Sequence, residues 1–180
     1  MIPFSKGDFM EQVLLVNLND EVIGLEEKMS AHEKVLLHRA FSVFLFNENK
    51  VLLQKRATSK YHCPGLWTNT CCSHPRLNET PAEAAIRRLQ EELDIHVENV
   101  REVNSFVYCY PFDNGLTEYE YDHVLIGEYN GSYVLNPEEV DDIQWIDIDE
   151  LKEDIRLNPR KYTPWFITAL NMAIQGRNCI

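Results

Sequence analysis

The most restrictive feature of the sequence is a strongly marked helix that lies between segments with strand character. Its start is indicated at Thr80, which can cap the helix, with Pro81 at the first helical position and Glu83 placed to close a capping box. Apolar residues then recur at three- and four-residue steps as far as Leu93, which predicts one apolar face. Such a face must be buried against another layer of structure.

Strand patterns flank this helix on both sides. A hairpin is predicted over residues 13–24, and a charged connector over residues 26–34 follows it. Further strands are predicted at residues 41–46, 51–55, 103–110, 118–128 and 143–148, and closing helices at residues 149–156 and 163–175. Strands interleaved with helices and joined by hairpins predict an α/β fold with a mixed β-sheet flanked by helices.

The length and the charge limit the classes of protein. A chain of 180 residues is close to the size of one domain, so we expect a single domain over residues 1–180, with residues 1–11 as a loose N-terminal extension. Twenty-nine acidic residues against 17 Lys and Arg give a net charge of -12, which argues against a nucleic-acid partner. A small anionic ligand in a locally basic pocket remains compatible with this charge.

The sequence also predicts a cytoplasmic protein without a membrane partner. No apolar run approaches the roughly 20 residues needed to span a bilayer, and the N-terminus lacks the pattern of a signal peptide. Five cysteines are an odd number, and Cys71 and Cys72 are adjacent, which does not suggest a disulfide framework. A reducing compartment follows from this pattern.

Residues 57–78 form a long segment without a clear period, and long irregular segments usually carry function. Here Cys72 and His74 are two residues apart, which suits a reactive thiol beside a metal-binding or proton-handling imidazole. A buried thiol and a hydrogen-bonded loop histidine fit the same spacing. A structural zinc site formed with Cys63 and Cys71 is a weaker alternative, because adjacent cysteines lack the usual spacer.

A second group of candidates could hold a metal. Glu118 and Glu120 point to the same face of a strand, where they repel each other unless a cation or a proton lies between them. Projection of both carboxylates into water is the alternative. Together with His32, His38 and His74 they would make a mixed nitrogen and oxygen site for Mn²⁺, Zn²⁺ or Fe²⁺.

A third group is basic. Its members lie beside the segments already named and are Lys28, Arg56, Lys60 and Arg88. Several cations around one pocket of an acidic protein suit a diphosphate or a similar dianion. Taken singly, each is more typical of a solvated surface charge.

Several runs resemble the type I isopentenyl-diphosphate Δ-isomerases. They are residues 36–42, Pro64-Gly65-Leu66-Trp67-Thr68-Asn69-Thr70-Cys71-Cys72-Ser73-His74-Pro75, residues 85–93, Glu118-Tyr119-Glu120 and Thr163-Pro164-Trp165. They follow the family order from about Gly24 to Trp165. The resemblance implies a Nudix-like α/β/α sandwich that interconverts isopentenyl and dimethylallyl diphosphate for isoprenoid biosynthesis. The family reaction protonates and deprotonates the substrate through a tertiary carbocation.

The resemblance also implies a role for each candidate. Cys72 and Glu120 would transfer protons, Tyr108 would be a hydrogen-bond partner and Trp165 would lie against the isoprenoid carbons. One divalent metal, Mn²⁺ or Zn²⁺, would be held by His32, His38, His74, Glu118 and Glu120. Glu92 would carry a Mg²⁺ bridged to the diphosphate. The phosphate oxygens would be bound by Lys28, Arg56, Lys60 and Arg88.

The stretch from Ser73 to Ile95 is also similar to the Nudix hydrolase box, from which it departs at three positions. Ser73 and Asp94 replace glycines, and Arg88 replaces a glutamate. The loss of a helix carboxylate weakens a Mg²⁺ cluster built to activate water, which favours the isomerase over a Nudix hydrolase. A catalytically inactive Nudix-fold binding module is the other alternative. The sequence leaves open the physiological metal, the oligomeric state and which group protonates in the forward direction.

Overall fold

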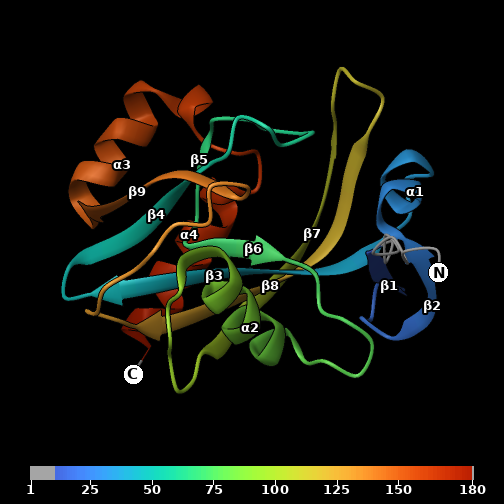
Figure 1. The fold of residues 1–180 in the computed structure, drawn as a ribbon, viewed down its shortest axis with the longest axis horizontal. Coiled ribbons are helices and arrows are strands. Elements are labelled where there is room, and N and C mark those ends of the chain that lie inside the picture. Colours follow the sequence, from blue (N-terminus) through green and yellow to red (C-terminus); the bar gives the residue numbers. More distant parts are fainter. Residues whose placement is uncertain (1–10, 180) are drawn as a thin grey trace, which may run out of the picture.

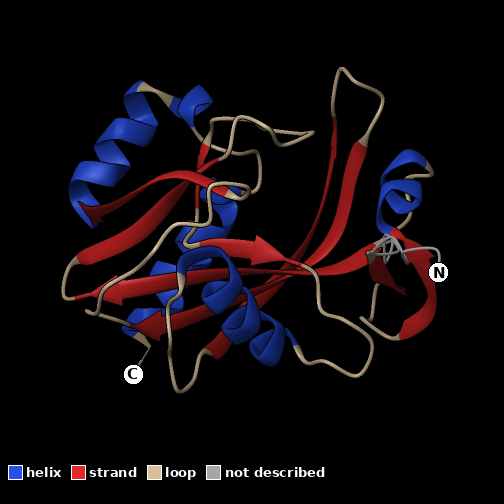
Figure 2. Cartoon of the chain, viewed as in Figure 1, coloured by secondary structure: helices blue, strands red, loops and turns tan. Residues whose placement is uncertain are grey.

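The computed structural model describes residues 11–179, in which nine strands form one sheet with helices on both faces (Figures 1 and 2). The strands are β1 (Gln12–Val16), β2 (Val22–Glu27), β3 (His38–Asn47), β4 (Lys50–Arg56), β5 (Trp67–Thr68), β6 (Cys71–Ser73), β7 (Arg101–Pro111), β8 (Thr117–Glu128) and β9 (Val140–Asp147). The helices are α1 (Lys28–Glu33), α2 (Pro81–Leu93), α3 (Ile148–Leu157) and α4 (Phe166–Asn178), with a short 3-10 turn, η1 (Pro159–Lys161). The expected α/β class is confirmed.

Strand β3 is the centre of the sheet. It pairs in parallel with β8 from His38 opposite Glu120 to Phe46 opposite Glu128. Its other edge pairs with β6, where Ser42 lies opposite Cys72. Because β6 and β8 flank the same strand, the two segments that the sequence analysis singled out are brought together across β3.

The apolar residues of β3 alternate between two cores, as the period of a strand requires. Phe41 and Val43 pack with the apolar face of α2, including Leu89. Phe44 packs on the opposite face with Phe166 of α4. A strand covered on both faces reads in sequence as a continuous apolar run, which explains the pattern at residues 41–46.

Helix α2 begins and ends as its sequence indicates. The hydroxyl of Thr80 accepts a hydrogen bond from the Glu83 amide, and the Glu83 carboxylate accepts one from the Thr80 amide, which confirms the capping box. Asp94 ends the helix in the left-handed conformation, with φ 51°. Left-handed backbone favours glycine, which is the residue that the hydrolase box has at this position.

The connector expected over residues 26–34 is wrong in part, because α1 forms within it. The Glu27 side chain caps this helix by accepting hydrogen bonds from the amides of Met29 and Ser30. The cap offsets the absence of a strong helical pattern in so short a segment. It also fixes His32, which lies fully buried on α1.

Smaller differences concern the ends of elements. The segment over residues 57–78 contains the short strands β5 and β6, which are held by pairing with β4 and β3 rather than by a pattern of their own. Ile148 starts α3 instead of ending a strand. The extension expected over residues 1–11 lies outside the described residues except for Glu11. None of the helices between residues 11 and 179 is long and apolar enough to cross a membrane.

Candidate active site

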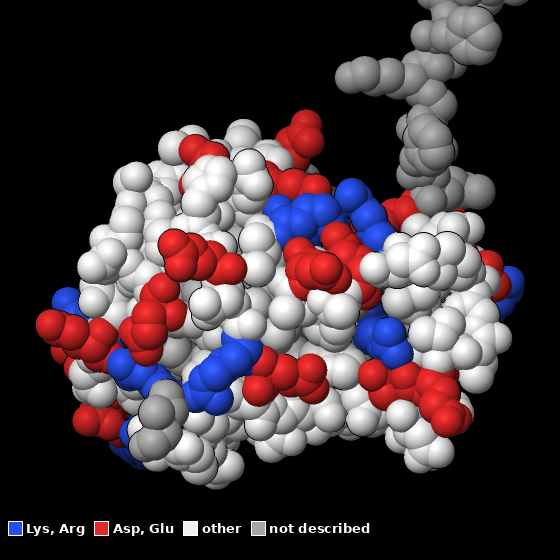
Figure 3. All heavy atoms as spheres, turned by 90° about the horizontal axis from the view of Figure 1, so that it is seen from below, with Lys and Arg blue, Asp and Glu red and all other residues white. Residues whose placement is uncertain are grey.

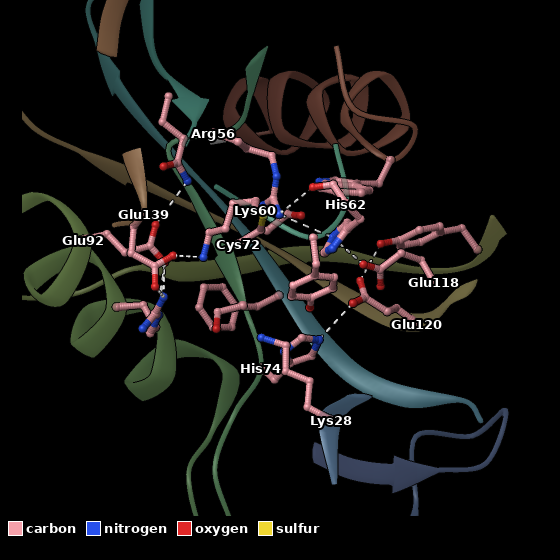
Figure 4. A pocket seen from close by; sticks show the side chains of 18 residues that line it. Lys28, Arg56, Lys60, His62, Cys72, His74, Glu92, Glu118, Glu120 and Glu139 are labelled. Carbon is pink, nitrogen blue, oxygen red and sulfur yellow. Dashed lines mark hydrogen bonds and ion pairs between the residues drawn. The ribbon is translucent and has the colours of Figure 1, made fainter. Parts of the chain in front are cut away.

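One pocket, with about 600 Å³ of space partly open to solvent, collects nearly all the candidate residues (Figure 4). Those that line it are Lys28, Arg56, Lys60, Cys72, His74, Arg88, Glu92, Tyr108, Glu118, Glu120 and Trp165. His32 and His38 do not line the pocket but lie fully buried beside these side chains. Residues from α1, β3, β4, β6, α2, β7 and β8 therefore meet at one place.

Strand register explains why the side chains around Glu120 meet. His38 of β3 and Tyr108 of β7 lie directly opposite Glu120 of β8 on its two sides. The Tyr108 hydroxyl donates a hydrogen bond to Glu120 Oε2 at 2.5 Å. His74 Nε2, from the segment that follows β6, lies 3.0 Å from Glu120 Oε1.

Four of the five predicted metal ligands form a tight cluster. One donor atom each from His32, His38, His74 and Glu120 lies within 4.8 Å of the others. All four residues are buried. Glu118, the fifth, is adjacent, with its Oε2 3.2 Å from His32 Nε2.

The hydrogen bonds of two histidines select the tautomer that a metal ligand needs. Nδ1 of His32 lies 2.6 Å from the Lys28 carbonyl oxygen, and Nδ1 of His38 lies 2.8 Å from that of Leu36. Each Nδ1 therefore carries the proton, which leaves a lone pair on Nε2. Both Nε2 atoms are buried without a hydrogen-bond partner, an arrangement that a bound cation would satisfy.

Electrostatics agree with this donor set. Burial acts to raise the pKa of Glu120, but the imidazoles of His38 and His74, which face this carboxylate, outweigh it and hold the pKa well below its ordinary value. Burial lowers the pKa of His74 to about 4, so its imidazole is neutral at neutral pH. An ionised Glu120 and a neutral His74 are protonation states that bind a divalent metal, and these two residues therefore fit one.

Cys71 and Cys72 point in opposite directions from β6. Cys71 is fully buried in the core beneath α2, whereas Cys72 lines the pocket. Burial raises the pKa of Cys72 to about 12, although Arg56 acts against it, and the thiol is therefore protonated at neutral pH. Within residues 11–179 the only metal-binding grouping found is the histidine and glutamate cluster, so the structural zinc site built on Cys63, Cys71 and Cys72 is wrong.

The basic residues also line the pocket. Arg88 Nη2 lies 2.6 Å from Glu92 Oε1 and 3.3 Å from Glu139 Oε1, and Lys60 forms an ion pair with Glu139. Arg56 is 7% exposed, and its Nε is buried without a hydrogen-bond partner. A buried guanidinium with an unsatisfied donor is typical of a site for an anionic ligand.

These cations do not form part of a broad basic surface. On the face shown in Figure 3, acidic and basic side chains are interleaved. Lys28, the remaining basic candidate, pairs with Glu11 at 3.0 Å. Lys28, Arg56, Lys60 and Arg88 thus share the pocket with the carboxylates of Glu92, Glu118, Glu120 and Glu139.

Aromatic rings form one wall of the pocket. Trp165 is 4% exposed, and its ring centroid lies 6.0 Å from that of Tyr108. The guanidinium of Arg56 lies over the Trp165 ring at 5.9 Å from its centroid. An apolar and electron-rich surface thus lies beside the thiol and the carboxylates.

Three other pocket residues were missed by the sequence analysis. His62 contacts Glu118, while Gln54 donates a hydrogen bond to Glu92 Oε2 at 3.3 Å. The carboxylate of Glu139 forms ion pairs with Lys60 and Arg88. His62 lies inside the irregular segment that was expected to carry function, and this was the one sequence feature that could have indicated it. Gln54 and Glu139 have no such feature, because they are ordinary residues of a strand and a loop.

Comparisons with known proteins extend these observations. A family model described as NUDIX domain matches residues 36–166. "Isopentenyl-diphosphate Delta-isomerase 2" of Aromatoleum aromaticum is 47% identical over 93% of this chain and 89% of its own length. "Isopentenyl-diphosphate Delta-isomerase" of Serratia proteamaculans is 44% identical over 89% of each chain.

Solved structures share the fold. A protein of Deinococcus radiodurans has a TM-score of 0.66 at 22% identity, covering 82% of this chain and 90% of its own. A MutT NUDIX hydrolase from Burkholderia pseudomallei has a TM-score of 0.61 at 20% identity, covering 76% and 97%. The predicted Nudix-like sandwich is confirmed. With nearly half of its residues identical to those of curated relatives over almost the whole length, the chain belongs to the isopentenyl-diphosphate Delta-isomerase family of NUDIX domain proteins.

Proposed function

We propose that this protein interconverts isopentenyl diphosphate and dimethylallyl diphosphate in isoprenoid biosynthesis. One observation carries the proposal. A protonated thiol, Cys72, and an ionised carboxylate, Glu120, line the same pocket from the two strands that flank β3, beside a set of buried cations. Moving a double bond requires one group that gives a proton and another that takes one, and these two residues supply them.

Cys72 and Glu120 transfer protons to and from the substrate from different directions. The substrate double bond takes a proton at one carbon, a tertiary carbocation forms, and a proton leaves another carbon. Cys72 and Glu120 exchange roles when the reaction runs in reverse. Tyr108, which donates to Glu120 Oε2, fixes the orientation of that carboxylate.

The carbocation must be shielded from water, which would trap it as an alcohol. Trp165 and Tyr108 present ring faces that stabilise positive charge. The burial of Trp165 also keeps this wall of the pocket dry. The aromatic wall therefore protects the intermediate and stabilises its charge.

The diphosphate must be held without being cleaved. Lys28, Arg56, Lys60 and Arg88 bind its oxygens as point charges and hydrogen-bond donors. Glu92 would hold the Mg²⁺ that accompanies the diphosphate. The absence of a glutamate at Arg88 removes a carboxylate that water activation would use.

A second divalent metal, Mn²⁺ or Zn²⁺, would be held by His32, His38, His74, Glu118 and Glu120. When bound, its positive charge keeps the nearby carboxylates ionised. The chain's own contribution is the buried donor set and its fixed tautomers.

The net charge of -12 and the five free cysteines support a cytoplasmic enzyme that has no nucleic-acid partner.

Solvent exchange tests the reaction directly. With isopentenyl diphosphate in D₂O, the protein is expected to place deuterium in the prenyl diphosphates, because protons pass through groups that exchange with solvent. NMR of the products and an assay for free phosphate and diphosphate are the measurements. Release of phosphate or diphosphate without labelled prenyl product would show a hydrolase, and binding without either product would show a binding module.

Glu92→Gln is expected to raise the Mg²⁺ concentration for half-maximal activity by about tenfold or more, since a charged ligand oxygen is lost. The prenyl diphosphate KM should rise with it. Titration of the initial rate with Mg²⁺ at fixed substrate measures the effect. Glu91→Gln is the matched control, because Glu91 also contacts Arg88 but lies outside the pocket lining. An unchanged Mg²⁺ dependence in Glu92→Gln would remove this residue from the site.

A further inference from the structure

His62 is a pocket residue that the proposed reaction does not use. It lies in the loop between β4 and β5 and is 8% exposed. Its Nε2 is 2.6 Å from Glu118 Oε1, the shortest contact that Glu118 makes within the described residues. In Figure 4, His62 and His74 approach the two carboxylates from different sides.

The two oxygens of Glu118 have different surroundings. Oε1 is occupied by His62, whereas Oε2 lies 3.2 Å from His32 Nε2. Glu118 Oε2 and His32 Nε2 are both buried without a hydrogen-bond partner. The contact with His62 therefore fixes the rotation of the carboxylate so that its unoccupied oxygen faces the donor cluster.

The protonation pattern of His62 agrees with a donor role. Its Nδ1 is also buried without a hydrogen-bond partner. A neutral imidazole carries one N–H, and a buried N–H without an acceptor is costly, so the proton belongs on Nε2. Nε2–H then donates to Glu118 Oε1.

The ring of His62 is held by its neighbours. Its centroid lies 4.4 Å from that of Tyr61, 5.4 Å from Phe112 and 6.0 Å from Trp165. Its carbonyl oxygen accepts a hydrogen bond from Arg56 Nη2 at 3.3 Å. Because these contacts hold the imidazole in place, the ring can fix the position of the carboxylate rather than move with it.

We propose that His62 is a positioning residue, which holds Glu118 through Nε2–H so that the second carboxylate oxygen is directed at the metal. The inference rests on the proposed function only in taking Glu118 as a metal ligand. Hydrogen bonds to the non-coordinating oxygen of a ligand orient it, and their loss typically weakens metal binding by roughly 10- to 100-fold. His62 is not part of the donor cluster formed by His32, His38, His74 and Glu120, and its Nε2 is occupied by Glu118.

Two substitutions separate the hydrogen bond from the ring. His62→Phe keeps an aromatic ring but has no donor, whereas His62→Gln has a side-chain N–H that can reach the same place. Metal-free protein is titrated with Co²⁺ alone, and the dissociation constant and visible absorption spectrum are recorded. We expect His62→Phe to bind Co²⁺ about 10- to 100-fold more weakly with a shifted spectrum, and His62→Gln to lie within about threefold of the parent protein.

Phe112→Leu is the packing control, because Phe112 contacts the same ring without a hydrogen bond to Glu118, leucine keeps an apolar side chain there, and Tyr61 and Trp165 still hold the ring. It is expected to leave the Co²⁺ affinity unchanged, and thermal unfolding of the metal-free proteins checks that each variant folds. Parent-like affinity in His62→Phe, or failure of His62→Gln to restore it, would overturn the proposal. No prenyl diphosphate is used, so tight metal binding by a protein that does not isomerise would contradict the proposed function and leave this inference standing.

Discussion

Cys72→Ser is expected to lower the turnover of isopentenyl diphosphate by about 100- to 10,000-fold, the range that one general acid or base contributes. Serine keeps the shape of the side chain but is a far weaker acid than a thiol. The metal should remain bound, because Cys72 is not part of the histidine and glutamate cluster. Turnover by NMR and metal content by elemental analysis of the same preparation are the two measurements.

Cys109→Ser is the matched control for this change. Cys109 is also a free cysteine, but it is exposed on β7 and lies outside the pocket lining. Its replacement should leave both turnover and metal content unchanged. Near-parental turnover in Cys72→Ser would remove the thiol from the reaction, and coupled loss of metal and turnover would assign Cys72 to the metal site instead.

The fold could be predicted to the extent that single segments carry their own pattern. The capping box at Thr80 and the apolar face of α2 are local, so the helix was predicted within a residue of its ends. β3 and β4 were also found, because runs of buried apolar residues do not depend on a distant partner to be recognised. Helix α1 could not be found this way, since its cap is Glu27 and six residues are too few to show a period.

The site depends on register, which the sequence does not display. His38 and Glu120 are neighbours because β3 and β8 pair in parallel across more than eighty positions of the chain. Residue types and spacing indicated most of the candidates, but Tyr108, Trp165 and Glu92 were indicated only by the resemblance to a family. His62 could not be found in this way, because neither its spacing nor the matched motifs indicate the contact with Glu118.

Ion pairs between distant segments also explain why the sequence could not assign a role to each basic candidate separately. Arg88 contacts three carboxylates, Glu91, Glu92 and Glu139, and the last of these comes from a loop fifty residues away. Such an arginine is equally typical of a surface ion-pair network until its partners are known. Arg56 differs, since its buried and unsatisfied Nε appears only once the pocket is closed around it.

His74→Ala is expected to lose both the tightly bound divalent metal and measurable turnover. The substitution removes one of the four clustered donors and also the contact from Nε2 to Glu120 Oε1 at 3.0 Å. Metal affinity should fall by at least about 100-fold, the upper end of what loss of a supporting group alone produces. Elemental analysis after gel filtration, with turnover measured on the same sample, checks both parts.

His96→Ala is the matched control for His74→Ala, because His96 is exposed, pairs with Asp94 and is not part of the donor cluster. This variant should keep full metal content and full turnover.

The pKa of Glu120 gives a second test of His74→Ala. With His74 removed, one of the groups that hold the Glu120 pKa well below its ordinary value is lost, so burial should raise this pKa. Infrared titration of the carboxylates in metal-free protein should then show one group protonating at higher pH than in the parent. Full metal occupancy in His74→Ala would contradict the assignment of this histidine, and with it the reason for the burial of three imidazoles around one carboxylate.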